Sequence, residues 1–422
     1  MGFLSALLSR KDSCNEQSVQ KGAFMQDLYR RLRKELMARL ALAGEVTDKQ
    51  IREIITELVI DAGKERYMTL EERSDISKEL FYSVRKLDVL QDLIDDRQVT
   101  EIMVNGPECI FVERAGRLTR VKSRFSSPEK LDDVIQQIVG KVNRVVNESS
   151  PIVDARLPDG SRVNVVTAPV ALEGPILTIR RFPEVPITMD KLISYGSITG
   201  EAAAFLETLV MSGYSIIVGG GTSAGKTTFL NALSNYIPKT ERIITIEDNA
   251  ELQIQGVPNL VRMEAKQANM EGNAEITIRD LIKSSLRMRP DRIIVGEVRG
   301  GEAVDMLQAF NTGHDGSLCT VHANSTYDML SRLETMVLMA FPLPLAAIRR
   351  QIASGVDILI HLGRLRDHSR RVLEIAEVDG MDRDEVRIHS LFSWNDEKET
   401  LEKTGELIHR LKLIRSGAAA EK

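Results

Sequence analysis

The sequence predicts an α/β fold, in which a domain built on a parallel sheet follows a smaller α+β domain and a helical N-terminal extension. Three observations support this prediction. Leucines recur at helical spacing near the N-terminus, short strand patterns fill residues 100–182, and strands alternate with long helical stretches over about residues 189–363. A chain of 422 residues also exceeds what one hydrophobic core usually serves, so we expect several domains.

The N-terminal extension, residues 1–97, is expected to be helical. Its leucines return every fourth residue among charged side chains, and a second amphipathic stretch over 49–61 follows the capping residues Thr47 and Asp48. The apolar faces are expected to pack on a neighbouring element, whereas a basic cluster could instead contact acidic lipid or a partner protein. The leucines are Leu28, Leu32, Leu36 and Leu40, and the cluster comprises Arg30, Arg31, Arg33 and Lys34.

Residues 98–183 are expected to form a compact α+β domain. Strand patterns over 101–104 and 109–112 flank the turn sequence Asn105-Gly106-Pro107, and two alternating segments over 162–166 and 177–180 follow. A helix-like segment over 131–147 separates these two pairs of strands. Residues 184–188 are expected to be a linker because two prolines bound the segment Pro183 to Pro186.

Residues 189–394 are expected to form the parallel α/β domain. Its strand candidates are short apolar runs followed by helical stretches, and the last two candidates are expected to pair with each other. A polar C-terminal tail over 395–422 is expected to be mostly helical or frayed. The strand candidates are 215–219, 242–246, 292–296, 318–322, 371–378 and 385–393.

Composition argues against two classes of function. A net charge of −5 and an aromatic content of 5%, with one Trp, disfavour nucleic-acid binding, which needs clustered cations and stacking surfaces. The three cysteines form no CxxC pair, so neither a zinc site nor a disulfide framework is indicated, and a reducing cytosol fits best. Because no apolar run approaches about 20 residues, attachment to a membrane would need a partner.

The segment Gly220 to Thr227 matches the phosphate-binding loop pattern GxxxxGK[ST]. The glycines let backbone N–H groups turn inward around phosphates, and an apolar run before the loop and a helical run after it supply the required strand–loop–helix context. Lys226 is expected to reach the β- and γ-phosphates of ATP, and the Thr227 hydroxyl to bind Mg²⁺. The residues expected to contact the nucleotide are Gly220, Gly221, Thr222, Ser223, Ala224, Gly225, Lys226, Thr227 and Thr228.

Two groups of acids follow predicted core strands. Glu297 ends the run Arg292 to Gly296, where α/β folds place ligands, so it is a candidate to polarise the attacking water or to help hold Mg²⁺. Glu247 and Asp248, with Glu251 nearby, follow the run Arg242 to Ile246 and are candidate ligands of Mg²⁺, directly or through water. An ordinary acidic loop remains the alternative for this second group.

Two of the six histidines flank one predicted strand. His314 lies in a Gly-rich turn before the strand 318–322, and His322 ends it. A lone histidine is usually structural, but two histidines that flank one predicted core strand could sense the γ-phosphate, and His322 is the stronger candidate.

Three longer motifs resemble those of the type II/IV secretion ATPase superfamily. They are Thr245-Ile-Glu-Asp248, residues 286–299 and residues 312–324, which resemble its Asp box, Walker B and His box. Residues 99–105 and 150–182 resemble its CpaF/TadA-like branch, which drives Tad (Flp) pilus assembly. The resemblance covers roughly residues 99–381.

The resemblance implies a RecA-like P-loop NTPase domain at the C-terminal side and a ring-shaped homo-hexamer with ATP held between the N-terminal and RecA-like domains. It also implies N-terminal-domain arginines that reach the nucleotide. Arg162 and Arg180 join Lys226, Glu297 and His322 as catalytic candidates. Arg156 and Arg181 fall in the same segment, and sequence alone cannot choose among the four; the core offers Arg287, Arg289 and Arg299 as comparable candidates.

Two departures from the family pattern stand out. The loop carries Ser223 and Ala224 where the family usually has Gly and Ser, which leaves the backbone cradle in place but reduces loop freedom. A four-cysteine metal element, present in many type II secretion ATPases, is missing, so that branch is disfavoured.

These observations predict a cytoplasmic hexameric ATPase that powers pilus assembly or secretion, peripheral to the inner membrane and bound to inner-membrane platform proteins. The alternative is a conjugative DNA-transfer or other DNA-processing RecA-like ATPase, against which the acidic pI speaks. A third hypothesis, a nucleotide-gated scaffold with little turnover, is disfavoured by the intact Lys226, Thr227 and Glu297.

Overall fold

The computed structural model describes residues 28–40, 47–65, 67–85, 87–114, 116–140, 144–157, 159–181, 186–266 and 275–417. The chain divides into two compact units, Met1–Phe182 and Pro183–Lys422. Residues 1–27 of the expected extension and residues 184–185 of the expected linker lie outside the described part. None of the helices in the described part is long and apolar enough to cross a membrane.

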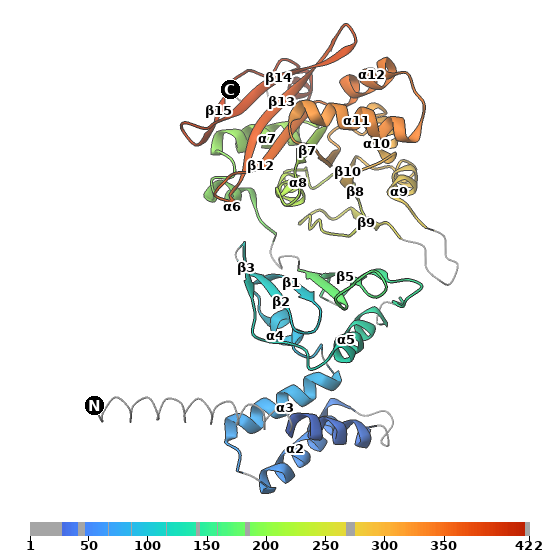
Figure 1. Ribbon diagram of the computed structural model, residues 1–422. Coiled ribbons are helices and arrows are strands. Elements are labelled where there is room, and N and C mark those ends of the chain that lie inside the picture. The colour runs from blue at the N-terminus through green and yellow to red at the C-terminus, as the bar shows by residue number, and fades with distance from the viewer. Residues whose placement is uncertain are drawn as a thin grey trace, which may run out of the picture. The chain divides into compact units, whose positions relative to one another are not determined.

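The first unit begins with three helices, 28–40, α2 (Asp48–Glu65) and α3 (Leu70–Arg85) (Figure 1). The leucines Leu28, Leu32 and Leu36 are buried together with apolar residues of α2 and α3, so the four-residue spacing marks a packed face. Before α2, the Thr47 N–H donates to Gln50 Oε1 (2.8 Å), and the Gln50 N–H donates to Thr47 Oγ1 (3.4 Å). This reciprocal cap satisfies N–H groups that have no partner within the helix.

An antiparallel six-stranded sheet forms the rest of the first unit, in the order β3-β2-β1-β6-β5-β4. Alternate residues of its central strands are buried against α5, as the sequence pattern predicted. The strands β3 and β4 were not predicted, because every residue of β3 is exposed and β4 lacks clean alternation. The bounds are α4 Leu90–Asp95, β1 Val99–Asn105, β2 Ile110–Arg114, β3 Arg117–Arg120, α5 Pro128–Gly140, β4 Ile152–Arg156, β5 Arg162–Val166 and β6 Ile176–Arg180.

A nine-stranded mixed sheet forms the centre of the second unit, in the order β15-β14-β13-β12-β7-β11-β10-β8-β9. The strands from β12 to β9 in this order run parallel, and β13, β14 and β15 extend the sheet antiparallel. The bounds are β7 Ile216–Gly220, β8 Ile243–Glu247, β9 Leu260–Glu264, β10 Arg292–Val298, β11 Leu318–His322, β12 Ile358–Arg364, β13 Arg370–Asp382, β14 Glu385–Asn395 and β15 Thr400–Lys403.

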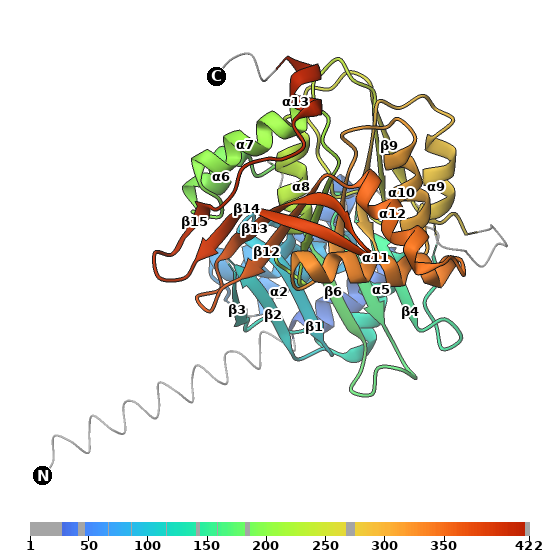
Figure 2. The same ribbon diagram turned by 90° about the horizontal axis from the view of Figure 1, so that it is seen from above.

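Helices cover both faces of this sheet (Figure 2). In β7, Ile216 and Val218 join the apolar cluster of α6, α7 and α8, whereas Ile217 joins the cluster of α9, α10, α11 and α12. Strands buried on both faces read as continuous apolar runs, which is why the sequence predicted β7, β8, β10 and β11. β12 is buried in the same way but was not among the predicted strands. The helices are α6 Met189–Ser194, α7 Gly200–Met211, α8 Lys226–Ser234, α9 Ile278–Ser285, α10 Glu302–Asn311, α11 Thr326–Ala340, α12 Leu345–Gly355 and α13 Leu411–Ser416.

The C-terminal segment differs from the expected polar, frayed tail over 395–422. Within its described part, β15 pairs with β14, and Leu401 and Leu407 are buried. The buried carboxylate of Glu377 on β13 accepts hydrogen bonds from the backbone N–H groups of Ile408 and His409, both at 2.7 Å. Two isolated leucines make no periodic pattern, so only the tertiary contacts show that this segment belongs to the fold.

Candidate functional site

The loop Gly220 to Thr227 joins β7 to α8, as the P-loop pattern requires. Every residue of β7 is buried, and a Cβ at Gly220 would lie 2.6 Å from the carbonyl oxygen of Leu362. Gly225 precedes α8 with φ +92°, a conformation that glycine adopts without strain. These glycines are therefore required by close packing and by the turn into the helix.

Ser223, at the position where the family usually has glycine, has φ +60°. This left-handed conformation crowds the Cβ of an L residue against its own backbone. Ser223 therefore adopts a conformation that glycine would adopt without strain.

Lys226 begins α8 with its side chain buried. Its Nζ donates to the carbonyl oxygen of Gly221 (3.2 Å) and lies 3.4 Å from both ring nitrogens of His322. Burial lowers the pKa of Lys226, and the nearby carboxylate of Glu297 only partly counters this effect. The Lys226 side chain therefore lies between the Gly221 carbonyl group of the loop and the His322 ring.

A β-bulge in β10 decides where Glu297 points. The register with β11 shifts between Val295 and Val298, and both valines belong to the apolar cluster of α9 to α12. Strict alternation would have put Glu297 on the same face as Val295, but the extra residue turns it away from that cluster. The Thr320 hydroxyl donates to the carbonyl oxygen of Gly296 (2.7 Å) within the bulge.

Glu297 is the centre of a polar group at the carboxyl ends of the parallel strands. Arg299 holds Glu297 Oε2 through Nε (2.7 Å) and Nη2 (2.6 Å), and Arg299 Nη2 lies 3.5 Å from Asp248 Oδ2. His322 Nε2 lies 2.6 Å from Glu297 Oε1, a contact with the distance but not the alignment of a hydrogen bond. Three strands, β8, β10 and β11, thus bring acid, arginine and histidine to one edge.

The protonation of His322 follows from its neighbours. Partial burial lowers the pKa of His322, and the charges of Lys226, Arg299 and Arg332 lower it further, against the opposing effect of Glu297. A neutral imidazole at neutral pH follows, with one nitrogen available as an acceptor. Arg332, on α11, was not found from the sequence because it lies outside the recognised motifs.

Glu247 ends β8 with its side chain buried. Its Oε1 accepts hydrogen bonds from the backbone N–H groups of Glu251 (2.9 Å) and Leu252 (2.8 Å), so one oxygen holds the loop that follows β8. Its Oε2 is buried without a hydrogen-bond partner. Burial raises the pKa of Glu247 to about 7.

Mg²⁺ is compatible with the donor types at this edge. Thr227 is half-buried at the start of α8, and the carboxylates of Asp248 and Glu297 supply the oxygen ligands that Mg²⁺ prefers. Among the described residues, however, no three His, Cys, Asp or Glu side chains form a ready-made metal site.

Other sequence candidates lie at the opposite edge of the parallel strands. His314 precedes β11, while His322 ends it, so a five-residue strand separates them. Arg287 and Arg289 similarly precede β10. His314 therefore does not join the group around Glu297, and neither do these two arginines.

The four candidate arginines of the first unit fall into two groups. Arg156, Arg162 and Arg180 are direct cross-strand neighbours on β4, β5 and β6. Since adjacent residues such as Val163 and Ile179 are buried with α5, the three arginines share the opposite face of the sheet. Arg181 instead donates to the carbonyl oxygens of Asp96 (2.6 Å) and Val99 (3.4 Å). We call Arg156, Arg162 and Arg180 the arginine row.

A pocket of about 250 Å³ adjoins the phosphate-binding loop within the second unit. The start of α8 forms one wall, and the β12–β13 turn with Arg370 and Arg371 forms another. Neither arginine was predicted from the sequence, because no local pattern after β12 indicates that the chain returns to the loop.

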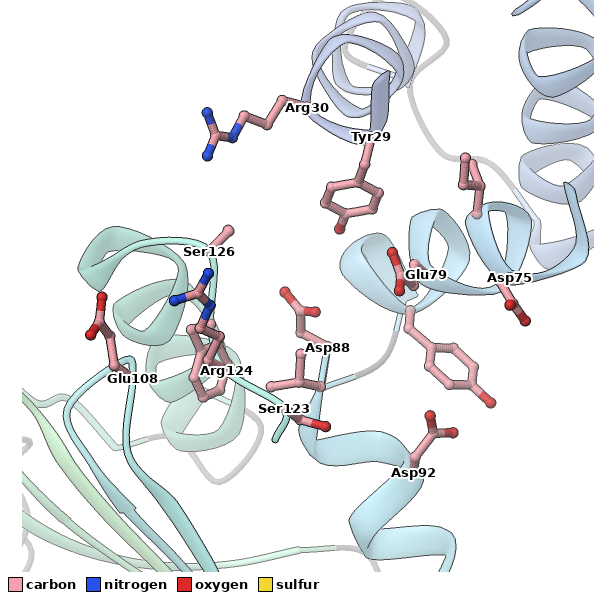
Figure 3. A pocket seen from close by; sticks show the side chains of 14 residues that line it. Tyr29, Arg30, Asp75, Glu79, Asp88, Asp92, Glu108, Ser123, Arg124 and Ser126 are labelled. Atoms are coloured by element: carbon pink, nitrogen blue, oxygen red, sulfur yellow. The ribbon is translucent and has the colours of Figure 1, made fainter. Parts of the chain in front are cut away.

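A larger cavity of about 620 Å³ lies in the first unit, apart from all motif residues (Figure 3). Helix 28–40 contributes Tyr29 and Arg30, and α3 and α4 contribute Asp75, Glu79 and Asp92. Arg30 of the basic cluster therefore faces an acidic cavity, and Arg33 of that cluster lies 3.8 Å from Asp133. Part of the cluster is thus engaged within this unit.

Taken together, the strand–loop–helix, the parallel sheet and the acid at a neighbouring strand end define a RecA-like P-loop NTPase, which confirms the expected fold class. Residues 84–405 match the protein family described as type II/IV secretion system protein. The chain belongs to this family, and the resemblance seen in the sequence is confirmed.

Individual relatives and a solved structure are similar to this chain over most of its length. The type IV secretion system protein VirB11 of Brucella suis is 34% identical over 303 residues, covering 65% of this chain and 84% of its own. The conjugal transfer protein TrbB of Rhizobium radiobacter is 32% identical over 305 residues, covering 70% and 90%. The ADP-bound pilus retraction motor PilT shares the fold, with a TM-score of 0.51, 20% identity and coverage of 79% and 87%.

Proposed function

We propose that this protein binds ATP with Mg²⁺ at the loop Gly220 to Thr227 and hydrolyses it to power a secretion or pilus-assembly machine. The observation that carries the proposal is the meeting of Lys226, Glu297 and His322 beside that loop. A lysine at the phosphates and a carboxylate that can orient water are the recurring parts of phosphoryl transfer to water.

In this proposal Glu297 orients the attacking water and accepts its proton. Arg299 now holds one oxygen of that carboxylate, and His322 faces the other. Phosphate oxygens are strong partners for a guanidinium, so bound nucleotide would compete with Glu297 for Arg299. Neutral His322 can then contact the γ-phosphate or the water without carrying charge of its own.

Mg²⁺ would be held by the Thr227 hydroxyl, with Asp248 or Glu297 acting directly or through water. Bound there, the ion would neutralise charge on the phosphate oxygens. Glu247 is a weaker candidate, because one of its oxygens is occupied by backbone N–H groups. Its buried Oε2 could still accept a hydrogen bond from an ordered water.

The pocket beside α8 is proposed to receive the nucleoside part of ATP. It is continuous with Gly225 and Thr228, and its walls combine apolar side chains with Arg370 and Arg371. Such a mixture suits a flat base that carries a polar sugar.

The arginine row is proposed to contact the phosphates when the protein assembles as a homo-hexamer. Arg162 has an ion pair with Asp154 (3.4 Å), but the row still concentrates like charges on one face of the sheet. A phosphate would be a strong partner there, because a guanidinium binds phosphate oxygens in a bidentate manner. Of the three, Arg162 and Arg180 remain our catalytic candidates.

The machine is proposed to lie at the cytoplasmic face of the inner membrane, where the hexamer pushes on membrane platform proteins. Pilus assembly of the Tad (Flp) type rests on the sequence resemblance. Conjugative DNA transfer is the second candidate, favoured by a relative named as a conjugal transfer protein. Strong stimulation of ATP turnover by DNA would support the second, whereas stimulation by membrane partners alone would support the first.

The direct test of the proposed function is Lys226→Ala. Lys226 is the cation that the loop itself supplies to the transferring phosphate, so turnover of ATP should fall to background without it. The measurement is phosphate release by the assembled protein with Mg²⁺, and circular dichroism checks that the variant is folded. A variant that hydrolyses ATP at the wild-type rate would refute the assignment of this site.

A further inference from the structure

We propose that Arg370, the first residue of β13, is a positioning residue that holds the phosphate-binding loop ready for its ligand. The inference rests on the proposed function, because it assumes that nucleotide phosphates bind at this loop. It assigns a role to a residue that lies outside the motifs recognised in the sequence.

The sheet topology brings Arg370 to the loop from far along the chain. β12 lies beside β7, with Leu362 opposite Gly220 at the entrance of the loop. The hairpin then reverses direction, and Arg370 pairs with Arg364 at the start of β13. The chain thus returns to the phosphate-binding loop 147 residues after Ser223.

Arg370 makes one directed contact and one packing contact with the loop. Its Nε donates to the carbonyl oxygen of Ser223 at 2.9 Å. Its Cδ lies 3.4 Å from the place that a Cβ on Gly225 would occupy, so the arginine stem lies close against the loop backbone. Together these contacts span the loop residues that lead into α8.

The hydrogen bond acts on the strained residue of the loop. Ser223 has φ +60°, where an L residue is disfavoured and the backbone would relax to another conformation if nothing held it. A donor on its carbonyl oxygen opposes that relaxation, because the hydrogen bond is lost when the carbonyl turns. Arg370 therefore supports the conformation that a glycine would adopt unaided.

The orientation of this peptide bears directly on phosphate binding. The C=O and N–H of one trans peptide point in opposite directions, so directing the Ser223 carbonyl to Arg370 directs the Ala224 N–H to the other side. There it donates to the carbonyl oxygen of Gly221 at 3.3 Å, to which Lys226 Nζ also donates. A phosphate would take over these two donors, which Arg370 helps to keep in place.

A competing explanation is that Arg370 binds the nucleoside, since it also lines the adjoining pocket. The two explanations differ for a ligand without a nucleoside. A positioning residue affects inorganic tripolyphosphate as much as ATP, whereas a nucleoside contact affects ATP alone.

The experiment measures binding of ATP and of inorganic tripolyphosphate, each with Mg²⁺, by calorimetry. The proteins are the wild type, Arg370→Gln and Arg370→Lys, each with Ser223 and with Ser223→Gly. Arg366→Gln, an exposed arginine in the turn of the same hairpin, is the matched charge control. Thermal unfolding of each variant checks the fold, and Arg370→Lys keeps the test open if Arg370→Gln is unstable.

With Ser223 present, Arg370→Gln should weaken the binding of both ligands about tenfold, which corresponds to the loss of roughly one hydrogen bond from a charged donor. Arg370→Lys should weaken binding less. In the Ser223→Gly background, Arg370→Gln should weaken binding less than about threefold, because glycine needs no support at positive φ. Arg366→Gln should bind both ligands as the wild type does. In turnover assays the effect should appear in KM rather than in kcat.

Three results would overturn the inference. A loss confined to ATP would make Arg370 a nucleoside contact, and equal losses in both backgrounds would show that it does not act through Ser223. A loss of the same size in Arg366→Gln would reduce the effect to general charge. If the wild type bound neither ligand, the proposed function itself would fail, and this inference with it.

Discussion

The two sheets of this protein carry their polar groups in different ways. In the second unit, Glu297 and His322 lie at or near the carboxyl ends of parallel strands, next to the loop that begins at Gly220. In the first unit, the arginine row also lies at strand ends: Arg156 ends β4, Arg162 begins β5 and Arg180 ends β6. In a parallel sheet the shared chain direction brings the carboxyl ends of all strands to one edge, whereas in an antiparallel sheet starts and ends alternate and the register decides which residues meet.

Among the changes that compare the two sheets, those in the arginine row should have the largest effect. If it completes the site in the assembled protein, Arg162→Gln or Arg180→Gln should lower ATP turnover roughly 10³-fold, as loss of an arginine finger does, with a modest change in ATP affinity. The measurement is steady-state phosphate release at protein concentrations that give the oligomer.

Arg181→Gln is the matched control for this prediction. Because Arg181 binds the carbonyl oxygens of Asp96 and Val99, its loss should lower the unfolding temperature rather than turnover. Near-wild-type turnover in Arg156→Gln, Arg162→Gln and Arg180→Gln would show that the arginine row takes no part in hydrolysis. The two sheets would then differ in architecture alone.

A second, smaller effect should separate binding from chemistry at the other sheet. Glu297→Gln keeps the shape of the side chain but loses the base, so turnover should fall roughly 10²-fold or more while ATP binding persists. Nucleotide titration and phosphate release on the same preparation give the two quantities. Should binding and turnover fall together, Glu297 would be a structural residue of the bulge.

The smallest effect concerns Glu247 and stability. Burial raises its pKa from 4.5 to about 7, so the folded protein holds the proton more tightly than the unfolded chain does. This favourable contribution is fully present below pH 4.5 and is lost as pH rises toward 7. Glu247→Gln keeps an acceptor for the backbone N–H groups and removes the titration. The unfolding temperature of this variant, relative to that of the wild type, should therefore rise by a few degrees between pH 5 and pH 8.

Thermal unfolding of nucleotide-free protein at several pH values measures this difference. Glu397→Gln, an exposed acid between β14 and β15, should show no such trend. If the Glu247→Gln curve runs parallel to that of the wild type over this range, Glu247 does not titrate within it.

Much of the second unit was readable from the sequence because its strands are buried on both faces. Continuous apolar runs marked β7, β8, β10 and β11, and each run led into a motif residue that lies beside the site in the structure. Two strands of this sheet, β9 and β12, were not predicted: β9 is only partly buried, whereas β12 carries the same kind of buried apolar run, Ile358 to Ile360, as its neighbours. The other segments that were not predicted lack such a pattern. β3 is exposed at every residue, and β15 follows a polar turn with a single buried leucine.

The sequence by itself determined the fold class, the phosphate-binding loop and the set of candidate residues, because each depends on residues close together in the chain. Tertiary structure decided how those residues are used. A bulge aims Glu297 away from the core, strand register separates the arginine row from Arg181, and a hairpin returns Arg370 to Ser223. These outcomes depend on the pairing of strands distant in sequence, and no local pattern carries that information.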